Sequence, residues 1–355
     1  MRAIAGAFVA SRAIVLALLI LFGNLQLVRT TFVFVKETRI TLRSEPLVDV
    51  FSAGDAKWFR IIAEDGYVRA PFHTGMQVNW AFFPLYPMAT RYLRVLPYVL
   101  NATILTHLFF LGALLMLHRL ARATGFDERA VMYMAFFPTS YFFSLPMSES
   151  LFVLLAAGCC VAAFADRWWL AGLLGALASA TRVQGVLLVA FLLVLCWQRR
   201  RGWYSILLVP CGLAAFCFFL WRITGNPFAF ADIQSEWQRS AGFSQFAMFF
   251  RELPLVSAEW NFRALNFSML LLLAATALVL WKRGQPALAA FVAASFAVVV
   301  VSGSLQSAGR YVLSTFPVFL VLPTRRGYEL LLAALAVLLG ALTVLYALHY
   351  DLAMT

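Results

Sequence analysis

Long apolar stretches recur along the whole chain, with few charged residues between them. Of the 355 residues, 63% are hydrophobic and only 12% are charged, whereas a soluble domain has roughly 25% charged residues. Such a chain cannot cover itself with a water-facing surface, so its solvent must be mostly lipid. We therefore expect an all-α, polytopic membrane protein, because a helix satisfies its own backbone hydrogen bonds within a bilayer.

The apolar stretches predict about eleven transmembrane helices in a single domain covering residues 1–355. One arginine, Arg12, interrupts the first stretch and is expected to reach the membrane surface or to face protein. The segment 82–100 contains several prolines, which favour short interfacial pieces over one span. The predicted spans are 3–28, 101–120, 130–146, 149–165, 168–181, 184–198, 203–222, 264–281, 286–302, 311–323 and 328–348.

The net charge of +12 is concentrated in short basic loops between alternate apolar stretches. This placement is typical of cytoplasmic loops and puts the N-terminus in the cytoplasm. It also argues against nucleic acid as a partner, since the basic residues form no single binding surface. Two longer segments, 29–100 and 223–263, then lie on the outer side and hold most of the remaining charge.

The first outer loop contains GDAKWFRIIAEDGY, from Gly54 to Tyr67, with helical spacing between Asp55 and Asp65. At about 100° per residue, Trp58 and the apolar residues near it share one face, and basic and acidic residues share the other. This pattern predicts an amphipathic helix at the membrane surface. Asp55 falls on the apolar face. It could cap the helix, as Asp often does, or act as a general base.

Several motifs along the chain occur in one order. The Asp55 segment is followed by AFFPLYP (Ala81–Pro87), and four further stretches lie beyond it. This ordered set resembles the phosphatidylinositol-glycan class V (PIG-V) mannosyltransferase family of the GT-C glycosyltransferase superfamily. The family usually has Trp where this chain has Gly54, and the chain's length resembles a prokaryotic member. The further stretches are PMSESLFVLL (Pro146–Leu155), WWLAGLLGALASATRVQG (Trp168–Gly185), and the pair GNPFAFADIQSEWQR (Gly225–Arg239) and GRYVLSTFPVFL (Gly309–Leu320).

The resemblance implies a membrane enzyme that transfers a hexose, with mannose as the expected sugar. The donor would be a polyprenyl-phosphate-linked sugar, the acceptor hydroxyl would belong to a lipid or glycan, and the anomeric carbon would be inverted. Asp55 matches the family's loop carboxylate and takes the role of general base. No cofactor is implied. The expected location is a prokaryotic plasma membrane, with the active site on the extracytoplasmic side.

Two outer arginines, Arg182 and Arg310, depart from the positive-inside pattern. A guanidinium suits phosphate oxygens, so both are expected to bind the donor phosphate; the alternative is that they contact lipid headgroups. Glu149 could cap a helix, or orient the acceptor or an arginine. The expected substrate-binding residues are Trp58, Tyr86, Glu149, Gln184 and Tyr311.

The second outer loop contains Asp232, Glu236 and Arg239 at helical spacing, for which mutual salt bridges are the simplest explanation. The histidines and cysteines are scattered and form no metal-binding pattern, so no essential metal is expected. Two other function classes remain open: a lipid or sugar transporter or flippase, and a non-catalytic assembly partner. Nearly charge-free spans without a visible repeat argue against a transporter.

Overall fold

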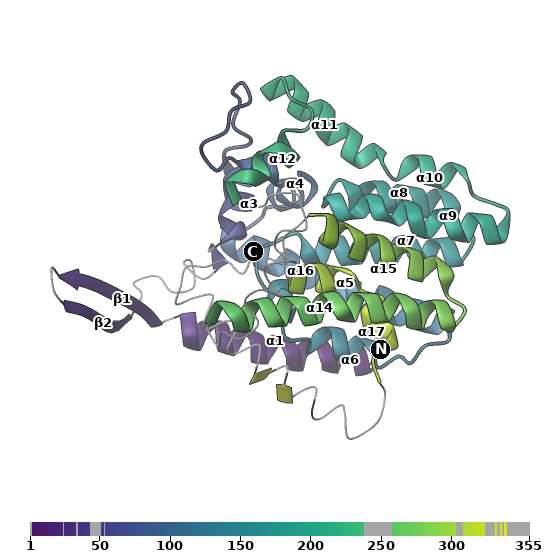
Figure 1. Ribbon diagram of the computed structural model, residues 1–355, viewed down its shortest axis with the longest axis horizontal. Coiled ribbons are helices and arrows are strands. Elements are labelled where there is room, and N and C mark those ends of the chain that lie inside the picture. The colour runs from purple at the N-terminus through teal and green to yellow at the C-terminus, as the bar shows by residue number, and fades with distance from the viewer. Residues whose placement is uncertain are drawn as a thin grey trace.

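A computed structural model describes residues 2–23, 25–32, 35–42, 51–52, 54–237, 258–302 and 308–323, with a few isolated positions in 331–338. These residues are helical apart from one two-stranded hairpin (Figure 1). Two helical stretches, Tyr98–Thr124 and Tyr204–Thr224, are long and apolar enough to cross a membrane, and six apolar helices are shorter. This architecture is compatible with the expected polytopic membrane protein.

The helices lie side by side and leave shorter elements at one end of the bundle. The longer helices and strands are α1 (Arg2–Gly23), β1 (Leu25–Phe32), β2 (Val35–Leu42), α3 (Asp55–Glu64), α4 (Leu85–Tyr92), α5 (Tyr98–Thr124), α7 (Glu149–Phe164), α8 (Trp168–Ser179), α9 (Leu188–Arg199), α11 (Cys211–Thr224), α14 (Ala258–Lys282) and α15 (Pro286–Val301). The short elements are η1 (Asn79–Ala81), α6 (Ala130–Ala135), η2 (Ser140–Phe143), η3 (Val183–Leu187), α10 (Tyr204–Leu208), α12 (Ala229–Asp232), η4 (Ile233–Trp237), α16 (Ala308–Ser314) and α17 (Val318–Val321).

Glycines let α8 approach α10 closely. A Cβ atom on Gly172 would lie 2.7 Å from Leu208 Cδ1, and one on Gly175 would lie 2.7 Å from Val209 Cγ2. Small residues at such contacts allow backbones to pack tightly, which helices in lipid need because the hydrophobic effect does not drive them together. Gly172 and Gly175, three positions apart on α8, therefore allow the close packing of α8 against the 204–209 segment.

Two of the predicted spans are wrong as continuous helices. The 130–146 segment forms α6, a break around Pro138 and then η2, and the 311–323 segment is divided at Pro317 between α16 and α17. A proline lacks the N–H needed for the helical ladder and its ring clashes with the preceding turn. The 203–222 span is interrupted at Pro210, between α10 and α11, but the two helices follow each other as one apolar helical stretch, Tyr204–Thr224.

The N-terminal span ends earlier than its apolar sequence predicts. Helix α1 ends at Gly23, and Leu25–Leu42 form an antiparallel hairpin in which Leu25 pairs with Leu42. The pattern of apolar residues to position 28 did not predict this change from helix to strand. The predicted 328–348 span lies almost wholly outside the described residues, as do positions 238–257 of the second outer loop.

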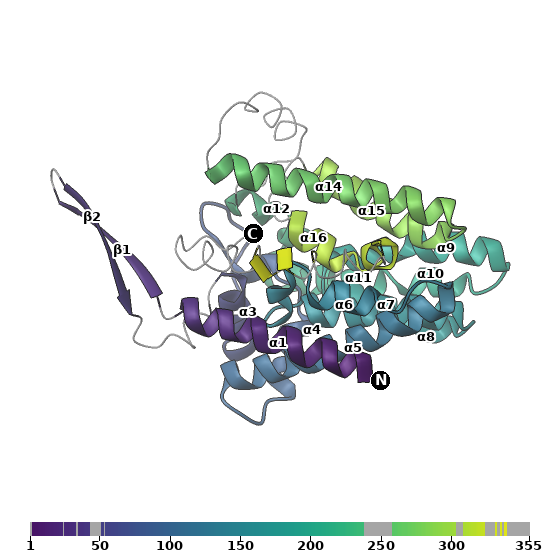
Figure 2. The same ribbon diagram turned by 90° about the horizontal axis from the view of Figure 1, so that it is seen from below.

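Elements of the two long loops, 29–100 and 223–263, gather at one end of the bundle, around α3, α4, α12 and α16 (Figures 1 and 2). The 82–100 segment forms the short helix α4 and the start of α5, which confirms the expectation of short pieces there. Backbone contacts join α3 to α4 and α12 to η1. The residues expected to form the site therefore come together at this end.

Candidate functional site

Asp55 is the first residue of α3, and its side chain is buried. The cap position belongs to Gly54, and no side chain caps this end of the helix, so the capping alternative for Asp55 is wrong. Gly54 has φ 57° and ψ −134°, a backbone conformation that glycine adopts far more easily than residues with a side chain. The chain therefore enters α3 through a turn that its glycine suits and that the family's Trp would not.

The amphipathic character predicted for α3 is confirmed. Phe59 and Ile62 are buried on the same side as Asp55, whereas Lys57 is exposed. The Phe59 ring meets the Tyr86 ring edge to face, with 5.2 Å between ring centroids. These contacts press α3 against α4 and fix the direction in which Asp55 projects. The helix ends at Glu64, and Gly66 follows with φ 89°, a left-handed conformation that suits glycine after a helix end.

Asp55 accepts a short hydrogen bond from Arg310 Nη1 of α16 through its Oδ2 atom. The same arginine donates from Nε to Glu149 Oε1 at 2.9 Å, and its Nη2 also contacts that oxygen. Arg182 Nη1 donates to Glu149 Oε1 at 2.7 Å. Arg310, Arg182 and the two carboxylates therefore form one chain of ion pairs.

The fully buried Glu149 lies at the centre of this chain of ion pairs. Its Oε1 atom receives all of these arginine contacts, and its Oε2 atom is buried with no hydrogen-bond partner. The cap of its helix is Ser148, without a side-chain bond, so Glu149 does not cap the helix. The alternative that Glu149 orients arginine side chains agrees with these contacts.

Arg310 is held on further sides by the segment that precedes α7. Its guanidinium carbon lies 4.9 Å from the centroid of the Phe142 ring, and its Nη2 lies 3.9 Å from Met147 Sδ. A cation over an aromatic face is stabilised by the ring quadrupole. The formal charges of Asp55, Glu149 and the two arginines cancel, so this quartet is neutral as a unit.

A cavity of roughly 390 Å³ lies against the quartet. Asp55, Arg182 and Arg310 line it together with Tyr311, and aromatic side chains form much of the remaining wall. A mixed wall of charged, hydroxyl and aromatic groups is typical of a small-molecule site. Its size is at the lower end for a drug-sized ligand, which suits a sugar head group. The aromatic and polar residues of the wall are Phe59, Phe82, Phe83, Phe230, Ser148, Thr181, Gln234 and Ser302.

The structure separates the expected site residues into two groups. The cavity-lining group is Asp55, Arg182, Arg310 and Tyr311. The remaining four, Trp58, Tyr86, Glu149 and Gln184, are not among the lining residues, and each has a role within the protein.

Those internal roles differ. Trp58 stacks on Phe82 with 5.8 Å between centroids. Tyr86 is fully buried, with its hydroxyl 2.7 Å from Thr106 Oγ1. Gln184 Nε2 donates to Thr315 Oγ1 at 3.0 Å, and its Oε1 is buried without a hydrogen-bond partner.

Sequence reasoning missed several uncharged lining residues, including Ser148 and Gln234. Ser148 Oγ accepts from Arg182 Nη1 at 3.1 Å, so it also positions that arginine. The family motifs contain these residues, but their uncharged side chains give no chemical signal in a sequence.

The salt bridges predicted around Asp232 depend on Arg239, which lies outside the described residues, so they stay a prediction. Asp232 accepts from Asn226 Nδ2 at 2.8 Å, and Glu236 accepts from the backbone N–H of Gly75 at 3.0 Å. The contact between Glu236 and Gly75 joins the two long loops.

No group of three or more His, Cys, Asp or Glu side chains meets in a metal-binding arrangement within the described ranges. Arg310 binds both site carboxylates, those of Asp55 and Glu149. The described site thus offers cationic and anionic side chains for binding, and metal independence stays a prediction.

Comparison with curated proteins finds similarity over part of the chain. GPI alpha-1,6-mannosyltransferase 2 from Cricetulus griseus is 33% identical over 181 residues, which cover 46% of this chain and 35% of that protein. The protein of the same name from Homo sapiens is 32% identical over 165 residues, or 42% of this chain and 32% of the relative. The match thus spans about a third of the relatives' length.

No family model matches the chain, and no solved structure matches it. The relatives are named as mannosyltransferases, and the similarity to them is partial. The apolar helices are compatible with a chain embedded in a membrane.

Proposed function

We propose that this protein is a PIG-V-like membrane glycosyltransferase of GT-C type, with about eleven transmembrane helices. It transfers a hexose, with mannose as the proposed sugar, from a polyprenyl-phosphate-linked donor to a hydroxyl of a lipid or glycan. The site faces the extracytoplasmic side of a prokaryotic plasma membrane. The observation behind this proposal is the Asp55–Arg310–Glu149–Arg182 quartet beside the cavity of roughly 390 Å³.

The proposed reaction needs a base and a stabilised leaving group. Asp55 removes the proton from the acceptor hydroxyl, whose oxygen attacks the anomeric carbon. The bond from that carbon to the phosphate oxygen breaks on the opposite face, which inverts the configuration. The electron pair leaves with the polyprenyl phosphate, and nearby guanidinium groups stabilise its negative charge.

The two arginines are not equivalent in this scheme. Arg310 is 6% exposed and already bonded to both carboxylates, whereas the Arg182 side chain is 18% exposed and bonded to Glu149 and Ser148. Arg182 is therefore the first contact proposed for a donor phosphate. A phosphate that then reaches Arg310 competes with Asp55 for it, and the carboxylate is released for the acceptor only once the donor is bound.

This competition predicts an order of binding. Donor binds to the free protein, and acceptor binds productively only to the donor complex. Initial-rate and product-inhibition measurements distinguish this order from random addition. Random addition, with unchanged acceptor affinity in the absence of donor, would count against release of Asp55 by the donor.

The test of the function uses purified protein in lipid nanodiscs with synthetic polyprenyl-phosphate sugars and glycolipid acceptors. Asp55→Asn should lower transfer by roughly 10²–10⁴-fold, the usual contribution of a general base, and leave donor binding measurable. The matched control is Asp65→Asn, because Asp65 is exposed at the other end of α3. Full transfer by Asp55→Asn would refute the assignment of the base.

The same preparation distinguishes the competing function classes. Movement of a labelled donor lipid between leaflets, without sugar transfer to any acceptor, would identify a flippase instead. Absence of both transfer and lipid movement, in protein that still binds a partner, would favour an assembly role.

A further inference from the structure

Arg12, in the middle of α1, is buried although it is charged, with 3% of its surface exposed. All five of its N–H groups are directed at acceptors. Nε donates to Ser11 Oγ at 3.2 Å, Nη1 to Ser140 O at 2.8 Å and Ser144 Oγ at 2.9 Å, and Nη2 to Ala135 O at 2.9 Å and Ser140 Oγ at 3.2 Å. Each of these acceptors is neutral, so this arginine is organised to bind backbone and hydroxyl oxygens.

The acceptors all belong to α1 itself or to the broken segment 135–144. Helix α6 ends at Ala135, and Pro138 cannot donate a hydrogen bond. A helix end leaves carbonyl groups without partners in their own helix, and buried carbonyls need a donor. Arg12 supplies that donor to Ala135 O and Ser140 O, from a helix more than a hundred residues earlier in the chain.

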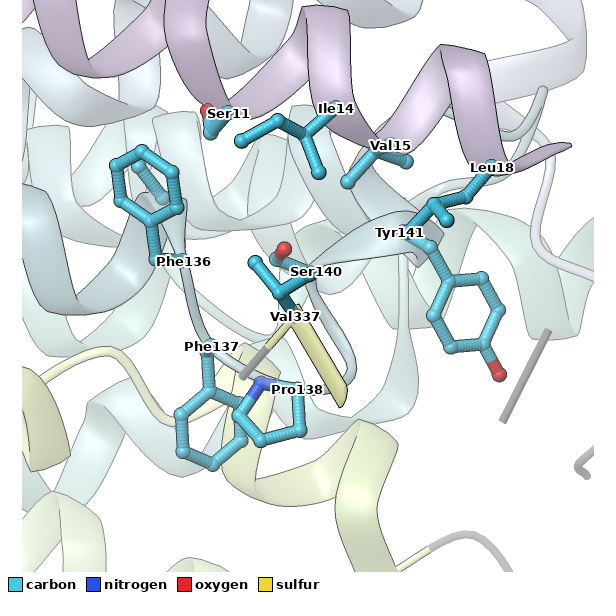
Figure 3. A pocket seen from close by; sticks show the side chains of 11 residues that line it. Ser11, Ile14, Val15, Leu18, Phe136, Phe137, Pro138, Ser140, Tyr141 and Val337 are labelled. Carbon is cyan, nitrogen blue, oxygen red and sulfur yellow. The ribbon is translucent and has the colours of Figure 1, made fainter. Parts of the chain in front are cut away.

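The contact between α1 and this segment is tight. Figure 3 shows Ser11, Ile14 and Val15 of α1 facing Phe136 and Ser140 of the broken segment. The crevice between the two has a volume of about 20 Å³, which is room for about one water molecule. The segment therefore has little freedom to move toward α1.

The same segment continues into residues that pack against Arg310 of the site. Phe142 packs under the Arg310 guanidinium at 4.9 Å, and Met147 Sδ contacts it at 3.9 Å. The next residues are Ser148 and Glu149, which bind Arg182 at 3.1 and 2.7 Å. The backbone from 135 to 149 thus joins the Arg12 contacts directly to the ion-pair quartet.

We propose that Arg12 is a positioning residue of this site, acting through the 135–149 segment. It fixes the unwound backbone from α1, and so sets where Phe142 and Glu149 hold the two arginines. Lysine cannot replace it, because three donors on one nitrogen cannot reach carbonyls as far apart as Ala135 O and Ser140 O while also binding Ser144. The effect on catalysis rests on the proposed function; the effect on the segment does not.

The experiment compares Arg12→Lys and Arg12→Met with Arg222→Met, a control that removes an exposed arginine from the apolar helix α11. Each is combined with Ser148→Cys, and a water-soluble thiol reagent then labels position 148 at the cavity wall. Mass spectrometry of the peptide gives the labelling rate separately from the native cysteines. We expect both Arg12 variants to change this rate at least about threefold, and the control to leave it unchanged.

Transfer kinetics give the second measurement, in the background without the cysteine. We expect Arg12→Lys to lower kcat by about 10–100-fold, the size of effect that misplacing catalytic groups by about 1 Å produces, and Arg222→Met to leave it unchanged. Unchanged labelling and unchanged kcat in Arg12→Lys would overturn the proposal. If the Arg12 variants alter labelling but the wild-type protein transfers no sugar, the positioning role is supported and the proposed function is refuted.

Discussion

Glu149→Gln removes one charge from the quartet and almost no volume. Glu149 is fully buried, and its Oε1 atom accepts from Arg182 at 2.7 Å and from Arg310 Nε at 2.9 Å. Glutamine keeps an oxygen acceptor but leaves two guanidinium groups with Asp55 as the remaining carboxylate of the quartet. Breaking a buried ion pair by neutralising one partner costs about 3–5 kcal/mol, because the other charge stays buried without compensation.

The expected decrease in the free energy of unfolding is measurable by equilibrium unfolding of the purified protein in mixed micelles. Glu64→Gln is the matched control, because Glu64 also pairs with two arginines, Arg60 at 2.9 Å and Arg94 at 3.5 Å, but at partly exposed side chains. Exposed ion pairs contribute about 0–1 kcal/mol to the free energy of unfolding. We expect Glu149→Gln to cost several times more than Glu64→Gln. Equal losses in the two variants would refute the reasoning that Glu149 compensates buried cations.

Three further outcomes are expected. Arg182→Ala should weaken binding of a polyprenyl-phosphate donor about 10–100-fold, as loss of a charged hydrogen bond does, and Arg182→Lys should weaken it less; equal affinities, measured by equilibrium binding in nanodiscs, would contradict the phosphate role. Gly54→Ala should lower the free energy of unfolding by about 1–3 kcal/mol, since its φ is 57°, and a thermal melt that matches wild type would show that the turn relaxes. Treatment with EDTA should leave sugar transfer unchanged, and a loss that added divalent cation restores would establish a metal requirement.

The local features of the site could be predicted because they depend on neighbours in the sequence. Helix α3 was expected from the spacing of Trp58, Phe59 and Ile62, and it runs from Asp55 to Glu64. The importance of Arg182 and Arg310 followed from charge placement and the family motifs, and both line the cavity.

The long-range pairing could not be predicted. Nothing in the sequence around Asp55 or Arg310 indicates that the two bind each other, since a hydrogen bond between distant residues leaves no local pattern. Tyr86 and Gln184 were expected to bind substrate, and in the structure the Tyr86 hydroxyl and the Gln184 amide nitrogen have the protein partners Thr106 and Thr315. A polar side chain in an apolar segment needs a partner, and the sequence does not say whether that partner is a ligand or protein.

The prediction of continuous helices over the interrupted segments was wrong for a related reason. Hydropathy averages over a window, so the 130–146 segment scores as a span although Pro138 interrupts it. The interruption is stabilised by Arg12, on a different helix, which donates hydrogen bonds to the carbonyl groups of Ala135 and Ser140. Backbone outside a regular helix is acceptable at membrane depth where protein groups satisfy it, and the partner is visible only in three dimensions.

The ion pair between Asp55 and Arg310 spans 255 positions of the chain, which has a consequence for biogenesis. A polypeptide is made from its N-terminus, so Asp55 and Glu149 are placed before α16 exists. Until Arg310 arrives, Glu149 has Arg182 as its ion-pair partner and Asp55 lacks the arginine that pairs with it, and burial of an unpaired charge is costly. The end of the bundle that holds the site should therefore stay open during synthesis and close only when α16 docks. Chains that end before residue 308 would present that unneutralised acidic patch to the cell's membrane quality control.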